Sequence, residues 1–515
     1  MQKIVLVSFF VSVMFATAAA FSQQRSLADQ IMDADETRFA IIYSKLKEQA
    51  EQEVPVLVAE IERKLSEETN EDLKEKLAKR QANAGVALLK LNQPEKVWLL
   101  LKHSPDPRAR SYLIHRILPL GVDPKILIKR LDVEPDVSIR RALILSLGEF
   151  DTSAISFEIF REILSKLQEL YRTDSDPGIH AASEWFLSRF HRSDWLNQVN
   201  EDWALDRRQR ETRLERIESS LSEGDSTPQW YVNGQRQTMV VIPGPVEFLM
   251  ESPTTEKGRK EPETRHKTRI GRTFSVSARN VTLEQYRRFN KGNQLQEHVR
   301  IRTSGLPAAD TSNLPAIYTS WYEAVAYCNW LSNEEGIPEG QWCFVIAGNE
   351  TRLKDNYLSL TGYRLPTEAE IHYAIRAMAT TARYYGETDE LLPKYAWAGK
   401  QWMQGFQDLP HPVGRLKPND LGLFDAHGNC STWCQAIRKP FPHEAVEKLN
   451  EDQENDQELK IGDQQPVRGG GIGGVESEIR SDYCKYVRLT NQGYGLGFRL
   501  ARTIRVVPGA TSSTP

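Results

Sequence analysis

The chain has 515 residues, with 66 Lys and Arg against 70 Asp and Glu and a formal net charge of -4. This length exceeds what one hydrophobic core usually supports, so two or three domains are expected. The near-balance of charge argues against a general attraction to nucleic acid, which needs clustered basic residues. Hydrophobic content of 40% and charged content of 26% are those of an ordinary globular protein.

Residues 1–20 have the pattern of a secretory signal peptide. Lys3 precedes an apolar run that ends at Phe15, and three alanines up to Ala20 form a small-residue cleavage site. The alternative is an N-terminal membrane anchor, but the run is shorter than the ~20 residues that span a bilayer. We therefore expect an exported protein, periplasmic or extracellular, with no transmembrane segment in the mature chain.

Residues 27–200 predict an all-α domain of HEAT-like repeats. Three segments place an acid and a proline before an apolar helix, at Asp106, Glu134 and Asp176. The acid can cap the free N–H groups of the helix, and proline is tolerated in the first turn. Stacked helix pairs of this kind form platforms that bind protein partners.

Two sets of polar residues in this region have alternative readings. Four arginines either line a concave binding surface or pair with acids of the next repeat, and we favour pairing: Arg108, Arg110, Arg140 and Arg141. Four histidines match no compact ligand spacing, so we expect no metal site there: His103, His115, His180 and His191.

Residues 201–228 predict a charged helix and a linker, because opposite charges recur three and four residues apart before a Ser-, Gly- and Pro-containing break.

Four sequence blocks occur in a fixed order in the C-terminal half. They are Gly362–Glu370, Gly422–Asn429, Arg468–Gly470 and Gly497–Leu500. Together they resemble the sulfatase-modifying-factor family, whose founding activity is formylglycine generation. The resemblance implies that residues 229–503 form an α+β domain with a C-type-lectin-like fold, followed by a tail over residues 504–515.

The resemblance also implies a cleft, lined by Trp321, Arg364, Glu370, Trp433, Arg480, Ser481 and Arg499. Around it the chain departs from the family pattern at Glu251, Ile371, His372 and Gly471. The residues themselves predict local structure. Thr367 and Glu370 have capping-box spacing, and the β-branched runs around Pro243 predict a hairpin over residues 239–250.

The active members of the family oxidise a sulfatase cysteine to an aldehyde, with copper held by two cysteines five residues apart. Cys484 supplies one such thiol, and Leu489 stands where we place the other. Leucine offers no donor atom to a soft metal, so we expect no copper site. Cys484 remains the one candidate for a catalytic redox or metal-bound thiol.

Calcium is a further ion that the resemblance implies. Asp425 can begin the family's ligand loop, with the carbonyls of Gly428 and Cys430 available, but Thr432 replaces the closing acid. Calcium prefers six to eight oxygen ligands with carboxylates among them. The lost acid should weaken this site, and calcium binding stays an open alternative.

These observations lead to two hypotheses of different classes. We prefer a diverged, exported binding or scaffolding module, whose C-terminal cleft binds a peptide or glycan and whose repeats bind a protein partner. The alternative is an oxidoreductase that converts a sulfatase cysteine to formylglycine through Cys484.

Overall fold

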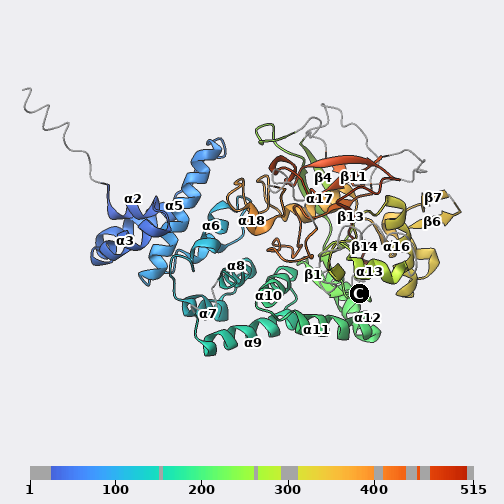
Figure 1. Ribbon diagram of the computed structural model, residues 1–515, viewed down its shortest axis with the longest axis horizontal. Helices are drawn as coiled ribbons and strands as arrows, with labels where there is room; N and C mark the ends of the chain where they lie inside the picture. The colour runs from blue at the N-terminus through green and yellow to red at the C-terminus, as the bar shows by residue number, and fades with distance from the viewer. Residues whose placement is uncertain are drawn as a thin grey trace, which may run out of the picture.

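The computed structural model in Figure 1 describes residues 25–149, 155–259, 265–290, 311–348, 350–399, 410–435, 449–452 and 464–506. The predicted signal peptide, most of the tail and most of an acidic segment near residue 455 lie outside these ranges. Among the residues described, no helix combines the length and the apolar composition needed to cross a bilayer.

The described residues before β1 form helices and turns only. In Figure 1, α7, α9 and α11 form an outer row, and α8 and α10 form an inner row toward the C-terminal half. This two-row arrangement is that of packed helix pairs, while the specific HEAT type stays a prediction. The helices are α2 (Leu27–Met32), α3 (Glu36–Glu48), α4 (Ala50–Glu62), α5 (Glu71–Lys90), η1 (Trp98–Leu101), α6 (Arg108–Arg116), α7 (Pro124–Val133), α8 (Val137–Leu147), α9 (Phe157–Thr173), α10 (Pro177–Arg189), α11 (Ser193–Leu205) and α12 (Arg207–Ser222).

The predicted acid-and-proline helix starts are correct in full at one of the three positions and in part at α6, where Asp106 accepts from Arg108 N at 3.2 Å. Asp176 caps α10 by accepting from Ile179 N, and proline begins that helix. At α8 the cap is Asp136 and not Glu134, because Asp136 is the residue whose carboxylate reaches the first free N–H groups. At α6 the N-cap position is a proline with no side-chain cap.

Two of the arginines form the predicted pairs with the following repeat. Arg140 lies 2.8 Å from Asp174, and Arg141 donates to Asp176 from Nε at 2.8 Å. Arg110 behaves differently, because its partner Asp420 belongs to the C-terminal half of the chain.

The described residues of the C-terminal half form four small sheets with the strand orders β1-β2-β5-β14-β8, β12-β11-β9-β13, β10-β4-β3 and β6-β7. The strands are β1 (Gln229–Val232), β2 (Thr238–Ile242), β3 (Val246–Met250), β4 (His266–Ile270), β5 (Phe274–Ser277), β6 (Phe344–Ala347), β7 (Glu350–Leu353), β8 (Tyr363–Arg364), β9 (Ser431–Trp433), β10 (Asn450–Glu451), β11 (Gln464–Arg468), β12 (Cys484–Arg488), β13 (Leu496–Phe498) and β14 (Ala501–Thr503). The short helices are α13 (Leu283–Phe289), α16 (Trp321–Glu334), η3 (Glu339–Gln341), η4 (Tyr357–Ser359), α17 (Glu368–Arg376), α18 (Leu392–Tyr395) and η7 (Glu476–Glu478).

The predicted hairpin over residues 239–250 is wrong. Strands β2 and β3 exist, but they belong to different sheets: β2 pairs with β1 and β5, and β3 pairs with β4. The fully buried apolar face of β2 favours a central position between two partners, which a two-stranded hairpin would not give it.

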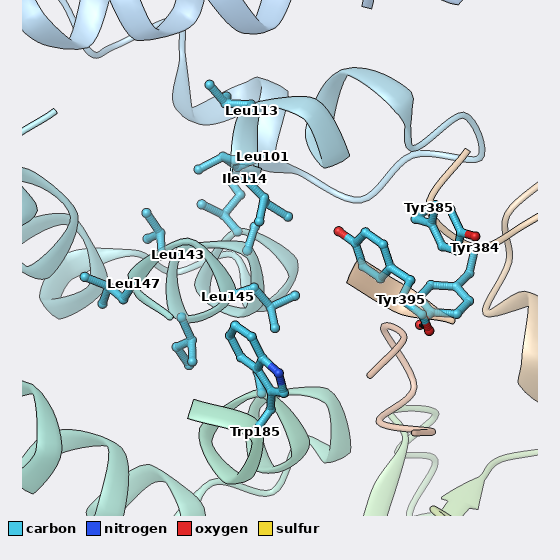
Figure 2. Close-up of a cluster of buried hydrophobic side chains, with 14 of the residues drawn as sticks. Leu101, Leu113, Ile114, Leu143, Leu145, Leu147, Trp185, Tyr384, Tyr385 and Tyr395 are labelled. Carbon is cyan, nitrogen blue, oxygen red and sulfur yellow. Dashed lines mark hydrogen bonds between the residues drawn. The ribbon is translucent and has the colours of Figure 1, made fainter. Parts of the chain in front are cut away.

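A shared hydrophobic core joins the helical and C-terminal halves. Figure 2 shows Leu145 and Trp185, from α8 and α10, beside a group of tyrosines from the C-terminal half. Tyr385 and Tyr395 stack in parallel with ring centroids 4.4 Å apart. These residues belong to one continuous buried cluster, so the two halves stabilise each other through apolar burial.

Buried polar contacts reinforce this junction. Asp420 accepts from Arg110 at 2.5 and 2.9 Å and lies 2.7 Å from His103 Nδ1. Glu149 of the helical half pairs with Lys417 of the C-terminal half. His180 stacks on Trp230 with centroids 3.7 Å apart. The scattered histidines of the helical half thus include groups that bind the C-terminal domain.

A close backbone approach across the junction requires a glycine at position 178. A Cβ atom there would lie 2.5 Å from the carbonyl oxygen of Asp420 and 2.5 Å from Arg141 Nε. We expect Gly178→Ala to destabilise the protein by about 1–3 kcal/mol, because the two halves must move apart. The measurement is the thermal unfolding midpoint. Gly340→Ala is the control, since a Cβ at Gly340 meets no atom within 4 Å, and an equal loss in both variants would contradict the prediction.

Candidate functional site

The residues predicted to line a cleft lie in the interior. Trp321 and Trp433 are fully buried in the core of the C-terminal half, and Trp433 donates from Nε1 to the carbonyl of Thr319 at 2.7 Å. Arg364 and Glu370 form a buried ion pair with two short contacts, at 2.6 and 2.7 Å. In this structure these four side chains support the domain from within.

The remaining three predicted cleft residues are also buried. Arg480 is 2% exposed, binds Glu256 and donates to the carbonyls of Ser477 and Gly258. Ser481 Oγ lies 3.2 Å from His427 Nε2. Arg499 donates to the carbonyls of Phe424 and Asp425. The structure therefore brings Arg480 and Ser481 close to β12, while Arg499, between β13 and β14, binds the separate loop that contains Asp425.

Cys484 is the one predicted site residue that is only partly buried. It is the first residue of β12 and lies opposite Arg468 of β11. Its thiol donates to Glu368 Oε1 at 3.2 Å, and the same oxygen accepts from Arg468 at 2.6 and 2.9 Å. Arg468 also pairs with Glu251. The site is therefore one thiol beside two carboxylates that share one guanidinium.

This environment keeps the Cys484 thiol protonated. Burial raises its pKa well above the ordinary value, the Glu368 carboxylate raises it further, and Arg468 only partly opposes them. Burial likewise raises the pKa of Glu251 to about 8, against the lowering effect of Arg468. Reactive cysteines have lowered pKa values in electropositive surroundings. Cys484 has the reverse arrangement.

No described cysteine lies where it could form a two-thiolate site with Cys484. Because β12 is extended, with about 3.3 Å of rise per residue, Leu489 lies about 16 Å along the chain from Cys484. Leu489 stands where the resemblance places the second cysteine of the family, and its fully buried aliphatic side chain offers no ligand atom. Five residues before Cys484 stands Ile479, which is also aliphatic and fully buried.

Cys434 is the remaining thiol near this sheet. It follows β9, which lies on the opposite side of β11 from β12. Strands are spaced about 4.8 Å apart, so the two cysteines are about 10 Å apart across the sheet. Disulfide partners need Cα atoms within about 7 Å. The residues around Cys484 therefore do not fit the copper pair that the resemblance implies.

The loop at Asp425 does not fit calcium either. Asp425 Oδ2 accepts from Gly414 N at 2.8 Å, and the guanidinium of Arg499 binds the carbonyls of Phe424 and Asp425. The carbonyl of Gly428 accepts from Cys430 N at 2.7 Å. The buried guanidinium of Arg499 thus already supplies a positive charge next to the single carboxylate of the loop, where a calcium ion would have to bind.

Sequence reasoning missed the carboxylates that define this site. Glu251 and His372 were noted only as departures from the family pattern, yet both take part in a buried charge network. His372 Nε2 lies 2.6 Å from Asp482, which Arg376 also binds. Burial lowers the pKa of His372 to about 4 in spite of Asp482, so the imidazole is neutral at pH 7. Glu251 and His372 each bind a residue far away in the sequence, Arg468 and Asp482 respectively, so their role is visible only once the fold brings these partners together.

The thiol environment predicts how Cys484 reacts with alkylating reagents. Glu368→Gln removes the negative charge beside the sulfur, which lowers the pKa of Cys484 and raises its thiolate fraction. A drop of one pKa unit increases that fraction about tenfold. We expect iodoacetamide to modify Cys484 about ten times faster at pH 8, as measured by mass spectrometry of the modified peptide. Glu256→Gln, which removes a buried carboxylate paired with Arg480 instead, should leave the rate unchanged.

The family model described as "Sulfatase-modifying factor enzyme 1-like domain" matches residues 226–504, which confirms the resemblance drawn from the four sequence blocks. Chaperone protein LppX of Paenibacillus barcinonensis is 28% identical over 146 residues, which cover 23% of this chain and 51% of that protein. The formylglycine-generating enzyme of Streptomyces coelicolor is 30% identical over 134 residues, 24% of this chain and 32% of the enzyme. The Mus musculus enzyme is 32% identical over 132 residues, 24% of this chain and 27% of the enzyme. The matches thus span about half or less of these relatives.

Two solved structures are also similar. Treponema denticola variable protein 1 has 23% identity and a TM-score of 0.43, covering 52% of this chain and 95% of that chain. PvdO from Pseudomonas aeruginosa has 19% identity and a TM-score of 0.40, covering 54% of this chain and all of that chain.

Proposed function

We propose that this chain, which belongs to the sulfatase-modifying factor enzyme 1-like family, is an exported protein-binding member that performs no copper-dependent oxidation. The observation that carries the proposal is the state of Cys484. Its thiol donates to a carboxylate, its pKa is raised, and aliphatic residues stand five positions away on both sides. A protonated thiol is not a ready thiolate ligand for Cu(I), and the aliphatic residues five positions away offer no second donor atom.

The relatives favour a protein as the partner. One is named a chaperone, and others are named formylglycine-generating enzymes, so the names cover activity with and without this oxidation. The simplest connection between the two activities within one family is that a member loses the oxidation step and keeps the recognition of a protein partner.

The outer row of helices supports contact with a protein. Val133 at the end of α7 is 70% exposed, Phe157 at the start of α9 is 72% exposed, and Leu205 at the end of α11 is 74% exposed. They lie at ends of the three helices of the outer row (Figure 1). Exposed apolar side chains of this size offer surface that a protein partner can cover. We assign partner binding to this row.

A copper titration tests the negative part of the proposal. The full chain is titrated with Cu(I) against a chelator, beside the Cys484→Ala variant, and each is incubated with a cysteine-containing sulfatase peptide. We expect equal Cu(I) binding in both proteins and no aldehyde in the peptide. Stoichiometric Cu(I) binding that is lost in Cys484→Ala, together with aldehyde formation, would establish the oxidoreductase alternative.

Suppression of aggregation tests the positive part. Reduced lysozyme, an exported protein, aggregates on dilution, and light scattering follows its aggregation. We expect the full chain to suppress scattering near equimolar ratio, and the Val133→Asp/Phe157→Asp variant to lose most of this effect. Ile346→Asp, at a residue 43% exposed on β6 of the C-terminal half, is the matched control. The proposal fails if the full chain does not suppress scattering, or if all three proteins act alike.

A further inference from the structure

A cavity of about 190 Å³ lies between the helical half and the C-terminal half, away from Cys484. One wall comes from α10 and α11, and the other from residues 236–238, 278–285 and 412–415. Neither half forms it alone, and the helices lie outside the segment that matches the family. The cavity is therefore a feature of this two-part architecture.

Four of the five charged side chains that line the wall are held in pairs, and the fifth, Arg415, is exposed to solvent. Arg279 lies 3.2 Å from Glu184, which is 4% exposed. The guanidinium of Arg279 also lies 4.4 Å from the centre of the Phe424 ring. On the opposite side Arg236 pairs with Glu284 and lies 2.7 Å from Glu201. The paired charges compensate one another, so Arg415, which is exposed and forms no ion pair with the described residues, is the one remaining charge that faces a ligand.

The rest of the wall is polar on nearly every side. It carries side-chain amides from both halves of the chain, namely Asn197, Asn200, Gln237, Asn280, Gln285 and Asn313. Four residues, Leu196, Ala278, Pro412 and Val413, supply the apolar contacts, and the described residues that line the cavity include no aromatic ring. Sites for drug-sized ligands are mostly apolar and aromatic, with a few polar groups. This wall has the reverse proportion.

We infer that this cavity binds a neutral, hydroxyl-rich ligand, a sugar unit either free or at the end of a glycan. Each hydroxyl of a sugar donates one hydrogen bond and accepts others. Side-chain amides likewise both donate and accept, and in the guanidinium–carboxylate pairs the guanidinium donates while the carboxylate accepts. A ligand with hydroxyls on all sides satisfies a wall that is polar on all sides, and its C–H face can meet the small apolar group. Some of these amides already bond within the protein, as Gln285 does with Thr282 N at 2.9 Å, while Asn280 Oδ1 has no hydrogen-bond partner among the described residues.

The test uses the full chain on a glycan array that carries neutral, sulfated and sialylated members, followed by calorimetric titration of the best binder. Free glucose, galactose, mannose and N-acetylglucosamine form a second arm, which separates free sugars from glycan ends. We expect binding to neutral members. Asn197→Trp, at an exposed residue of α11 on the wall, should weaken binding at least tenfold by filling the entrance.

The matched control is Gln198→Trp, because Gln198 is the exposed neighbour on α11 that does not line the cavity. It should keep the affinity within twofold, and it separates cavity filling from a general effect of tryptophan on the helix. Three outcomes overturn the inference. They are no binding to any neutral saccharide, binding to charged glycans only, and equal affinity in Asn197→Trp and the unmodified chain.

Discussion

Asp420→Asn is expected to destabilise the protein by about 3–5 kcal/mol, because it leaves a buried arginine of the other half without its counter-charge. Arg110 is 7% exposed and makes two hydrogen bonds to the Asp420 carboxylate, at 2.5 and 2.9 Å. Asparagine keeps the shape of the side chain and removes only the charge. Urea unfolding at pH 7 measures the loss, and the helical half should separate from the C-terminal half at lower urea concentration.

The pH dependence of this effect has a defined sign. Burial raises the pKa of Asp420, but Arg110, His103 and Arg141 outweigh it and hold the pKa well below the usual 3.8. A lowered pKa means that the stabilisation is complete above about pH 4 and is lost as the pH falls further. The difference in unfolding free energy between the unmodified protein and Asp420→Asn should therefore become smaller in acid.

The control for Asp420 is Asp389→Asn. Asp389 also pairs with a buried arginine, Arg383 at 2.8 Å, but its own side chain is 57% exposed to solvent. Exposed ion pairs contribute about 0–1 kcal/mol. A loss in Asp389→Asn as large as in Asp420→Asn would show that the destabilisation does not arise from burial at the junction of the halves.

Glu370→Gln is expected to cost a similar amount, about 3–5 kcal/mol, within the C-terminal domain. Glu370 is fully buried and accepts from Arg364 at 2.6 and 2.7 Å and from Arg272 at 2.8 Å. It also accepts from Thr367 N at 2.9 Å, and glutamine can keep that capping bond. The loss therefore reports the charge and not the helix cap.

Acid titration distinguishes this explanation from a packing defect. Burial raises the pKa of Glu370, but Arg272 and Arg364 together lower it to about 2 from 4.5. The stabilisation is complete above about pH 4.5 and disappears as the pH approaches 2. The gap in unfolding free energy between the two proteins should close over that interval, while a packing defect would persist.

Glu390→Gln is the control for Glu370. Glu390 pairs with Lys79 at 2.7 Å, and their side chains are 52% and 35% exposed. We expect a change of less than about 1 kcal/mol. If Glu390→Gln matches Glu370→Gln, or if the gap stays constant in acid, the charge explanation is wrong.

Local structure in the C-terminal half was largely predictable from the sequence. The capping box of Thr367 and Glu370 depends on residues three apart, and it forms at the start of α17 as expected. The helices α13 and α16 also begin with capping boxes. The hairpin prediction failed because strand partners are chosen over long distances. A β-branched run indicates a strand, but it does not say which strand lies beside it.

The composition of the candidate site was not predictable, because its members come from separate segments. Glu251 follows β3, Glu368 begins α17, and Arg468 ends β11, so only folding places all three within reach of Cys484. The spacing of five residues between family cysteines leads to Leu489, and that its side chain has no ligand atom follows from the residue type alone.

The sequence alone determined the family, the helical character of the N-terminal half and the absence of a thiol five residues from Cys484, because each depends on residue type and order. The tertiary structure decided that Asp420 holds Arg110 across the junction, that the predicted cleft residues are internal, and that the Cys484 thiol is neutral. The physical reason is that charge pairing, burial and the resulting pKa depend on distances in space, which long-range packing sets.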